Sequence, residues 1–423
     1  MKKKIVIVGG GFAGLELIRK LADHHLFDVV LVDRNNYHFF PPLLYQVSTA
    51  FIEPSNIAYP FRKLFQGRQN IRFFMGELIS VSPDTHTILT SNGLLNYDYL
   101  VLAMGAESNF FDNDNIAGSA LPMKTIDDAL NIRNHILLQI EEAVRTWCLK
   151  DKKRLSNVVI AGGGPTGVEM AGMLAEMAQH ISTKDYPEDG FIPGEIYLIN
   201  RPSSLLAPMS QRAQREAYET LDKLGVKIVL NTEVNDYIND EVVLSNGERI
   251  PSSTLIWTSG VIAREVDGLP AAAIARGRRI IVDEINKIKG CSNIFAIGDQ
   301  CFQTTDRNYP NGHPQLAQVA IQQGRLLGDN LKRLAANKPV RAFSYRDKGS
   351  MAIISKYRAV ADLPRIFLKG LFAWLIWLFV HILPLIGFRN KIKIAFNWFW
   401  SFVTNNPALR LIIRPVHKPN GRQ

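Results

Sequence analysis

Cysteine is scarce in this chain of 423 residues, with only Cys148, Cys291 and Cys301. No two of them form a CxxC pair, so the sequence predicts neither a disulfide framework nor a metal site. So few cysteines are typical of proteins from a reducing compartment, which makes the cytosol the default location. The apolar part of residues 1–8 is too short for a secretory signal, and none is expected.

Acidic residues are scarce in one segment, the C-terminal tail of residues 346–423. The tail holds 13 of the 49 Lys and Arg residues but only 2 of the 39 Asp and Glu residues. It therefore carries the whole positive excess of the chain, while the preceding residues are nearly neutral. Four of the six tryptophans also lie in the tail. Basic and aromatic residues together favour an anionic, partly apolar partner, with a membrane surface ahead of nucleic acid.

Glycine is concentrated in two runs, of which the first is Gly9 to Gly14. It follows the apolar residues 5–8, precedes a helical pattern, and is followed by a second apolar segment that ends in Asp33. In dinucleotide-binding folds such glycines let a pyrophosphate approach, and the acid binds a ribose. A glycine-rich turn that binds nothing is the alternative, and the surrounding pattern argues against it. The residues predicted to hold this nucleotide are Gly9, Gly10, Gly11, Phe12, Ala13, Gly14, Asp33 and Arg34.

The second run, Gly162 to Gly167, repeats the pattern about 150 residues later. Two fingerprints are more specific than one and predict one dinucleotide at each. An acid at the end of the following apolar segment would bind the 2′-hydroxyl of NAD and repel the 2′-phosphate of NADP. Asn200 and Arg201 stand there instead, so NADPH is a candidate beside NADH, unless Arg201 points into solvent. The residues predicted at this second nucleotide are Gly162, Gly163, Gly164, Pro165, Thr166, Gly167, Asn200, Arg201 and Gly260.

With these motifs, the chain resembles the two-dinucleotide-binding-domain flavoproteins, and within them type II NADH:quinone oxidoreductase, a single-subunit respiratory enzyme that does not pump protons. The most diagnostic run is Ala317 to Gln322, similar to the family pattern A-Q-x-A-x-Q, and residues 345–352 also match. The departures are Asn200 and Met104, where many relatives have Thr. The other matching residues are Tyr37, His38, Pro42 to Gln46, Ala103 to Gly105, Gly162 to Glu169, Gly298 and Asp299.

The resemblance implies that FAD takes a hydride from NADH and passes two electrons to a membrane quinone, either menaquinone or ubiquinone. It implies catalytic roles for Glu169, Gln318, Gln322 and Lys348, with Gln318 and Gln322 beside the flavin and the quinone. From the residues alone, Glu169 is equally a carboxylate at a helix start, the glutamines two solvated amides, and Lys348 a surface lysine. Further flavin contacts are expected at Leu78, Ala103, Gly105, Asp299 and Ala317.

The predicted fold is α/β, with two Rossmann-like dinucleotide-binding domains and a C-terminal membrane-binding helical region. The FAD domain is expected in two segments, residues 1–110 and 271–345. The NAD(P)H domain is expected at 111–270 and the membrane-anchoring region at 346–423.

Two apolar stretches in the tail are candidates for membrane contact. Residues 370–388 are almost unbroken apolar, at the lower limit of length for a spanning helix, and a buried core helix is the alternative. Residues 392–404 are amphipathic, which favours a position in the membrane interface or packing on the protein itself. The resemblance implies monotopic attachment at the cytoplasmic face of the cell inner membrane.

Other functions stay open at this point. A sulfide:quinone reductase needs cysteines that carry sulfur, and a ferredoxin-type flavin reductase uses a different acceptor. A non-enzymatic flavoprotein that binds nucleic acid through its basic tail is a third alternative, although the apolar tail argues against nucleic acid as a partner. A homodimer is a further expectation, because an exposed aromatic tail favours burial.

Overall fold

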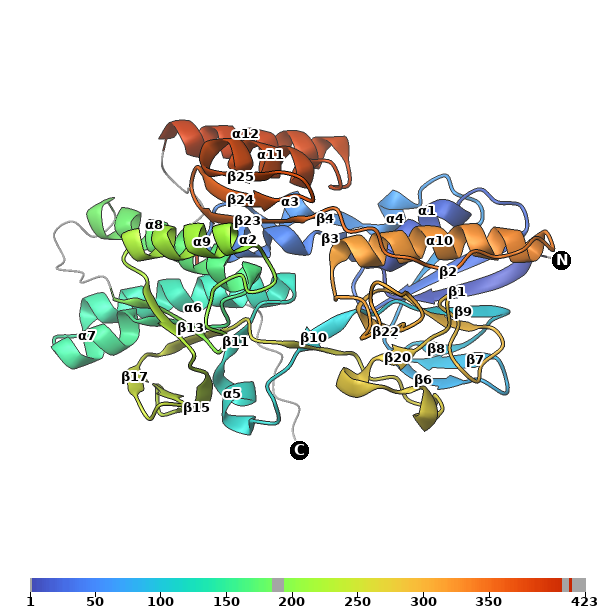
Figure 1. Ribbon diagram of the computed structural model, residues 1–423, viewed down its shortest axis with the longest axis horizontal. Helices are drawn as coiled ribbons and strands as arrows, with labels where there is room; N and C mark the ends of the chain where they lie inside the picture. Colours follow the sequence, from blue (N-terminus) through green and yellow to red (C-terminus); the bar gives the residue numbers. More distant parts are fainter. Residues whose placement is uncertain (1, 185–193, 405–410, 413–423) are drawn as a thin grey trace. The chain divides into compact units, whose positions relative to one another are not determined.

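The computed structural model describes residues 2–184, 194–404 and 411–412, without the side chains of residues 180–184 and 401–404. The chain divides into two compact units. The first comprises residues 1–39, 58–107 and 261–348, and the second comprises 40–57, 108–260 and 349–423. Each unit contains a five-stranded sheet whose mapped strand pairs are parallel, with helices in the connections, so the predicted α/β class is confirmed (Figure 1).

The main sheet of the first unit has the strand order β21-β9-β1-β2-β5. Its strands are β1 (Lys3–Val8), β2 (Phe27–Asp33), β5 (Ile71–Met75), β9 (Tyr99–Leu102) and β21 (Ile294–Ala296). Their apolar, largely β-branched residues are buried, as expected for a parallel sheet covered on both faces. Helices α1 (Phe12–Leu21) and α10 (Ala317–Ala335) pack closely. Gly324 allows this contact, because a Cβ atom at that position would lie only 2.3 Å from the carbonyl oxygen of Ala13.

Smaller sheets complete the first unit. The antiparallel sheet β6-β7-β8 is followed along the chain by the main-sheet strand β9, and the short pairs β3-β4 and β20-β22 connect other segments. The minor elements of this unit are β3 (Tyr37–Phe39), β4 (Ala58–Pro60), α4 (Phe61–Leu64), β6 (Leu78–Ser82), β7 (Thr87–Thr90), β8 (Gly93–Asn96), η2 (Ala271–Ala273), η3 (Arg276–Arg278), β20 (Ile280–Ile281), η4 (Gly298–Gln300) and β22 (Cys301–Phe302). Two further strands, β10 (Ala106–Ser108) and β19 (Val261–Ala263), form the remaining two-stranded sheet.

The main sheet of the second unit has the order β11-β18-β12-β13-β14. Its strands are β11 (Leu121–Pro122), β12 (Val158–Ala161), β13 (Ile196–Asn200), β14 (Lys227–Leu230) and β18 (Thr254–Trp257). Helix α6 (Ile126–Arg145) begins at a capping box, in which the Thr125 hydroxyl accepts from the Asp128 amide and the Asp128 carboxylate accepts from the Thr125 amide. The other elements are η1 (Pro41–Leu43), α2 (Leu44–Ser48), α3 (Pro54–Ile57), α5 (Asp114–Ser119), α7 (Leu149–Ser156), α8 (Pro165–Lys184), α9 (Gln211–Lys223), β15 (Val234–Ile238), β16 (Glu241–Leu244) and β17 (Arg249–Pro251).

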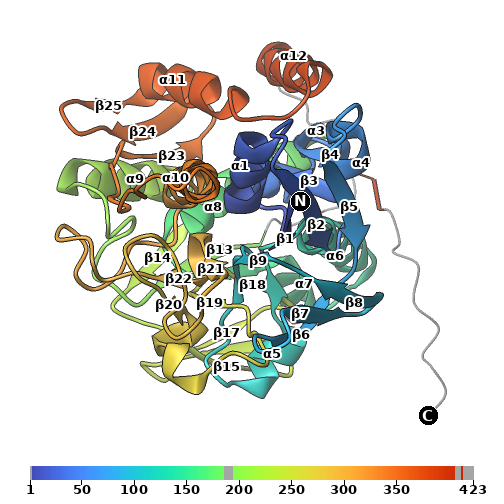
Figure 2. The ribbon, with the colours of Figure 1, turned by 90° about the vertical axis from the view of Figure 1, so that its right-hand side faces the viewer.

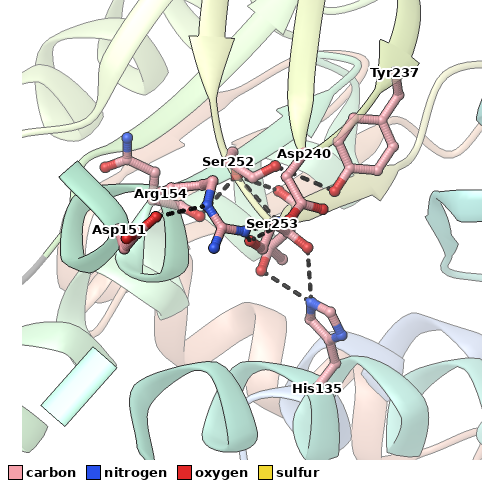
Figure 3. A network of polar contacts seen from close by, with 9 residues as sticks. His135, Asp151, Arg154, Tyr237, Asp240, Ser252 and Ser253 are labelled. Carbon is pink, nitrogen blue, oxygen red and sulfur yellow. Dashed lines mark hydrogen bonds and ion pairs between the residues drawn. The ribbon is translucent and has the colours of Figure 1, made fainter. Parts of the chain in front are cut away.

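A polar network ties the helices of this unit to its strands (Figure 3). Arg154 of α7 pairs with Asp240 and with Asp151, and it donates to the Ser253 hydroxyl at 2.7 Å. His135 of α6 lies 3.0 Å from the Ser253 carbonyl oxygen, to which its Nε2 donates. Burial lowers the pKa of His135, so the ring stays neutral in this contact. The network therefore fixes α6 and α7 against the residues before β18 and the turn between β15 and β16, and we assign it a structural role.

The tail of the second unit forms an antiparallel sheet and two helices (Figure 2). The elements are β23 (Ser350–Ser355), β24 (Arg358–Asp362), β25 (Phe367–Lys369), α11 (Gly370–Ile382) and α12 (Phe388–Thr404). The apolar stretch 370–388 is thus interrupted, since α11 has 13 residues and α12 starts only at Phe388. In the described part of the chain, no helix is both long and apolar enough to cross a membrane.

The predicted domain boundaries can be compared with these two units. The boundaries expected at 110, 270 and 345 lie near the changes between units after residues 107, 260 and 348. Residues 40–57 and the tail from 349 belong to the compact unit that contains the second glycine run. The assignment of each segment to a cofactor stays a prediction, because compactness alone does not show which nucleotide a unit holds.

Candidate active site

The first glycine turn, Gly9–Gly14, connects β1 to α1. A Cβ atom at Gly9 would lie 2.3 Å from the Ala103 carbonyl oxygen, and one at Gly14 would lie 2.0 Å from the Gly9 carbonyl oxygen. Both glycines are therefore required by the packing of the turn itself. Gly11 differs, because nothing lies within 4 Å of a Cβ atom added there. The backbone at Gly11 is thus open beside a helix N-terminus, which fits the pyrophosphate of FAD.

Asp33 closes the first glycine turn from the end of β2. One carboxylate oxygen accepts from the Gly10 amide at 2.7 Å and the other from the Asn35 amide at 2.8 Å. Burial raises the pKa of Asp33 and outweighs these two hydrogen bonds. Arg34 lies 3.8 Å from Glu77 in a half-exposed ion pair. Asp33 therefore holds the turn in shape at the position where the sequence predicts a ribose-binding acid.

Other predicted flavin contacts lie at the carboxyl ends of strands in the same sheet. Ala103 follows β9 and packs against Gly9 through its backbone, while Gly105 has a left-handed φ of 72°. Asp299 follows β21 in the short helix that begins at Gly298, and its carbonyl oxygen accepts from Gln315 at 3.0 Å. Leu78 is partly buried against the core of this unit. Phe12 contacts the ring of His38 edge-on, with centroids 5.9 Å apart.

Two buried glutamines that sequence reasoning missed hold these strand ends in place. Gln300 accepts from the Met104 amide at 2.8 Å and donates to the Arg264 carbonyl at 3.0 Å. Gln323 accepts from the Gly298 amide at 2.8 Å. Both side chains are almost fully buried. The available signal was a polar residue on the apolar face of α10, because Gln323 stands at helical spacing from Val319, Ala320 and Leu327.

The predicted catalytic residues of the first unit converge on one segment, residues 346–348. The Gln318 side-chain oxygen accepts from the Lys348 amide at 3.2 Å. The Gln322 amide accepts from the Arg346 N–H at 3.1 Å and donates to the Arg346 carbonyl at 2.9 Å. Ala317 begins α10, which carries both glutamines on one face. The glutamines therefore bind the backbone next to Lys348, whose side chain is exposed.

The second glycine turn, Gly162–Gly167, repeats the first between β12 and α8. A Cβ atom at Gly167 would lie 1.8 Å from the Gly162 carbonyl oxygen, whereas a Cβ atom at Gly164 would have no neighbour within 4 Å. Pro165 opens the helix, where the missing N–H is no loss, and Thr166 follows it. Gly260 has a left-handed φ of 79°, and a Cβ atom there would lie 2.8 Å from the Phe111 ring. This turn fits a second nucleotide in the same way.

Asn200 takes the place that Asp33 has at the first turn. Its side-chain oxygen accepts from the Gly163 amide at 2.8 Å, and its amide nitrogen donates to the carbonyls of Pro202 at 3.2 Å and Ser204 at 2.9 Å. Asn200 therefore closes the turn without a charge. Arg201 is 80% exposed and lies 3.5 Å from Glu233, so it is available at the surface beside the turn.

Glu169 lies in α8, close to the second glycine turn in sequence. The carboxylate is buried, and it accepts a long hydrogen bond from the Ile353 amide at 3.4 Å. Burial raises the pKa of Glu169 to about 8, because this long hydrogen bond compensates little of the lost hydration. Glu169 is thus largely protonated at neutral pH. A solvated carboxylate at a helix start, which was the alternative interpretation, would be ionised at this pH.

The cysteine next to the Gly298–Asp299 turn, Cys301, does not support sulfur chemistry. Cys301 is fully buried, and burial raises the pKa of its thiol to about 11, so it is not a thiolate at neutral pH. Cys148 is exposed and Cys291 is partly exposed. Among the described residues, no group of His, Cys, Asp and Glu side chains could hold a metal ion.

Two nucleotide-binding turns of this kind in one chain define a flavoprotein oxidoreductase that pairs FAD with a pyridine nucleotide. Residues 3–324 match the family model described as pyridine nucleotide-disulphide oxidoreductase, and residues 348–405 match the NDH2 C-terminal domain. The chain is 33% identical to the type II NADH:quinone oxidoreductase Ndh of Mycobacterium tuberculosis, over 95% of this chain and 89% of the relative. The chain belongs to the type II NADH:quinone oxidoreductase family.

More distant proteins are similar to this chain in sequence or in fold. The type II NADH:quinone oxidoreductase of Haemophilus influenzae is 27% identical, over 87% of this chain and 88% of the relative. The fold is similar to that of NDH2 from Plasmodium falciparum in complex with NADH, with a TM-score of 0.87, 24% identity, and coverage of 98% of this chain and 100% of that chain. The sulfide:quinone oxidoreductase of Aquifex aeolicus has the same type of fold at a TM-score of 0.70 and 18% identity, over 96% of this chain and 92% of that chain.

Proposed function

We propose that this chain carries out the reaction of its family, as an FAD-dependent enzyme that oxidises NADH and reduces a quinone. The observation that carries the proposal is the presence of two open glycine turns in a chain of this family. FAD is held at the first turn by Gly9–Gly14 and Asp33, with Ala103, Gly105 and Asp299 at the neighbouring strand ends. NADH is held at the second turn. The chemistry that FAD supplies when bound is acceptance of a hydride from a nicotinamide and release of two electrons to an acceptor.

The experiment that tests this function is purification in detergent, followed by an absorption spectrum and turnover with a quinone analogue. We expect a flavin spectrum that bleaches on addition of NADH and recovers on addition of quinone. Parallel assays with ubiquinone and menaquinone analogues identify the quinone class, and assays with sulfide and with ferredoxin test the other acceptors. A colourless protein that neither binds added FAD nor oxidises NADH would contradict the proposal.

The contributions of the chain follow from the geometry of each unit. Gln318 and Gln322 bind the backbone of residues 346–348, so we assign them the positioning of Lys348. The cation of Lys348 would stabilise negative charge that develops on electron transfer. Glu169 holds a proton at neutral pH and is assigned to proton transfer during quinone reduction.

Membrane attachment is proposed for the two helices of the tail. Helix α11 exposes Phe372 and Phe379, and α12 exposes Phe396 and Trp400, with 52–75% of each residue accessible. The opposite side of the helices is buried through Trp374, Trp377 and Trp398. Such exposed aromatic side chains beside basic residues favour the interface of a bilayer, where a lipid-soluble quinone is also found. The side chains predicted to continue this face after Trp400 lie outside the described residues.

Serine at both Phe372 and Phe396 is expected to release the protein from vesicles while the flavin stays bound. Burial of one aromatic side chain contributes about 1.5–3 kcal/mol, so the two changes together should lower the partition coefficient by at least about 100-fold. Sedimentation with anionic vesicles measures this. Trp147→Ser is the matched control, because Trp147 is 98% exposed but lies outside the tail. Equal sedimentation of the double variant and the wild type would refute the assignment. Deletion after Asp362 is a poorer test, because it also removes the fully buried Trp377.

The choice between NADH and NADPH is expected to depend on Arg201. Serine at Arg201 should lower kcat/KM for NADPH by about tenfold and leave that for NADH nearly unchanged, because only NADPH presents a 2′-phosphate to the guanidinium group. Steady-state kinetics with both cofactors measure the ratio, with Arg249→Ser as a control at another exposed ion pair. An unchanged ratio would mean that Arg201 interacts with solvent and Glu233 only.

The cytoplasmic face of the cell inner membrane and a homodimer are two further proposals. The location is supported by the few cysteines and by the exposed apolar faces of α11 and α12. Protease digestion of sealed vesicles of either orientation tests the location. Light scattering in detergent tests the dimer, whose support is the same exposed aromatic surface.

A further inference from the structure

A second acid, partly buried, lies on the same helix as Glu169. Glu176 follows it by seven residues, about two turns of α8, so both side chains project from the same face. Each carboxylate accepts a backbone N–H from the segment that starts with β23: Glu169 from Ile353 at 3.4 Å, and Glu176 from Lys356 at 2.5 Å. Burial raises the pKa of Glu176 to about 7 and that of Glu169 to about 8. Near neutral pH, both acids can therefore take up and release a proton.

Glu176, unlike Glu169, lines a cavity within the second unit. Its volume is about 50 Å³, which is enough for water. Its wall is mostly apolar, and the few polar groups on it can bind that water. Aromatic rings from α11 and α12 line its other side. The lining includes Tyr45, Gln46, Glu176, Lys356, Trp374 and Trp398.

Tyr45 connects the two acids electrostatically. Its hydroxyl is fully buried, and its pKa is raised well above 10, first by burial and then by the negative charges of Glu169 and Glu176. The hydroxyl accepts from the Gln46 amide at 2.9 Å, and Gln46 in turn accepts from the indole N–H of Trp398 at 2.9 Å. Tyr45 thus stays protonated and lies within electrostatic reach of both carboxylates. Among the described residues, the titratable groups that interact electrostatically with Glu176 include Tyr45 from α2 and Lys356 from the turn after β23.

The stoichiometry of the proposed reaction requires a proton from solution. NADH yields one hydride, which carries two electrons and one proton, and becomes NAD⁺. A quinone takes up two electrons and two protons to become a quinol. One proton per turnover must therefore enter from water and reach the place where the quinone is reduced. A buried acid without a route to water could supply it only once.

We propose that Glu176 takes up this proton from water in the cavity and passes it, by way of Tyr45 and cavity water, to Glu169. This inference rests on the proposed function, because it specifies how the quinone receives its second proton. The proton lost by Glu176 is replaced from cavity water, so charge and atoms balance in each cycle. A purely structural Glu176, which caps the Lys356 amide, would not need a cavity or a second acid on the same helix face. Glu176 is accordingly a proton-relay residue that acts through Glu169.

The variant Glu176→Gln tests the relay. Its side chain keeps the oxygen that accepts from the Lys356 amide, but it cannot take up and release an acid proton. We expect bleaching of the flavin by NADH at the wild-type rate, because that step consumes no proton from solution. Its recovery on addition of quinone should slow by about 100-fold, at the lower end of the effect of a lost acid. In the wild type, recovery should slow as the pH rises above about 7, because Glu176 loses its proton there. The glutamine variant should lose this pH dependence.

Two further measurements complete the test. Glu176→Asp should restore part of the rate and of the pH dependence. Infrared difference spectra should lose one protonated-carboxyl band in Glu176→Gln but not in Glu248→Gln, a control at an exposed acid of the same unit. Wild-type rates and pH dependence in Glu176→Gln, with the flavin still bleached by NADH and restored by quinone, would overturn the relay alone. A wild-type protein that does not oxidise NADH or reduce quinone would overturn the proposed function instead.

Discussion

Alanine at Gly11 is expected to give a folded protein that no longer binds FAD. Gly11 has φ of −71° and ψ of −163°, which any residue adopts, and no atom lies within 4 Å of the added Cβ. The methyl group would instead occupy the space that a pyrophosphate needs against the backbone. We expect at least about a 100-fold loss of FAD affinity, at a melting temperature close to that of the wild-type apoprotein. Flavin absorbance after gel filtration and circular dichroism measure the two effects.

Alanine at Gly14 is the matched contrast, because its Cβ would lie 2.0 Å from the Gly9 carbonyl oxygen. Such overpacking costs about 1–3 kcal/mol or more, so this variant should lose stability as well as FAD. The second glycine turn offers the same pair in Gly164 and Gly167. Gly164→Ala should retain the flavin and raise KM for NADH by at least about tenfold, whereas Gly167→Ala should unfold more easily. Full flavin content in Gly11→Ala would show that the first glycine turn does not bind FAD.

Glutamine at Glu169 is expected to lower quinone reduction by about 100-fold or more, because the amide keeps the shape of the side chain but holds no exchangeable acid proton. Flavin bleaching by NADH should be much less affected. Stopped-flow measurement of the two half-reactions separates these effects. Unchanged quinone reductase turnover would remove Glu169 from the mechanism.

The stability of the same variant distinguishes a chemical role from a structural one. The pKa of Glu169 rises from 4.5 to about 8 on folding, so between these pH values the folded state binds more protons than the unfolded state. This group therefore makes the protein less stable as the pH rises from about 4.5 to about 8. Glu169→Gln removes the loss, so the variant should be more stable than the wild type at pH 8, as measured by denaturant titration. A variant that is slow yet more stable is not slow because it is unfolded.

Much of the fold was predictable because its signals are local. An apolar segment, a glycine run and a helical pattern within about 30 residues specify a strand–turn–helix unit, and both such units form as predicted. The tail was predictable in composition, but not in detail. Residues 370–388 read as one apolar stretch, whereas the structure ends α11 at Ile382 and begins α12 at Phe388. Trp374, Trp377 and Trp398 bury one side of these helices. Which side is buried depends on partners that are far away in sequence, such as Gln46, which accepts from Trp398.

The sequence by itself determined the class of this protein: two glycine turns after apolar strands, the A-Q-x-A-x-Q run, and a basic aromatic tail. Each of these depends on residues that are close together along the chain. Only the tertiary structure decided what the polar side chains do. It joined Gln300 to Met104, Gln322 to Arg346, and Glu176 to Lys356. It also buried Glu169 fully and Glu176 partly on one helix face. This burial raises the pKa of both acids, because a folded interior replaces the water that would otherwise stabilise their charge.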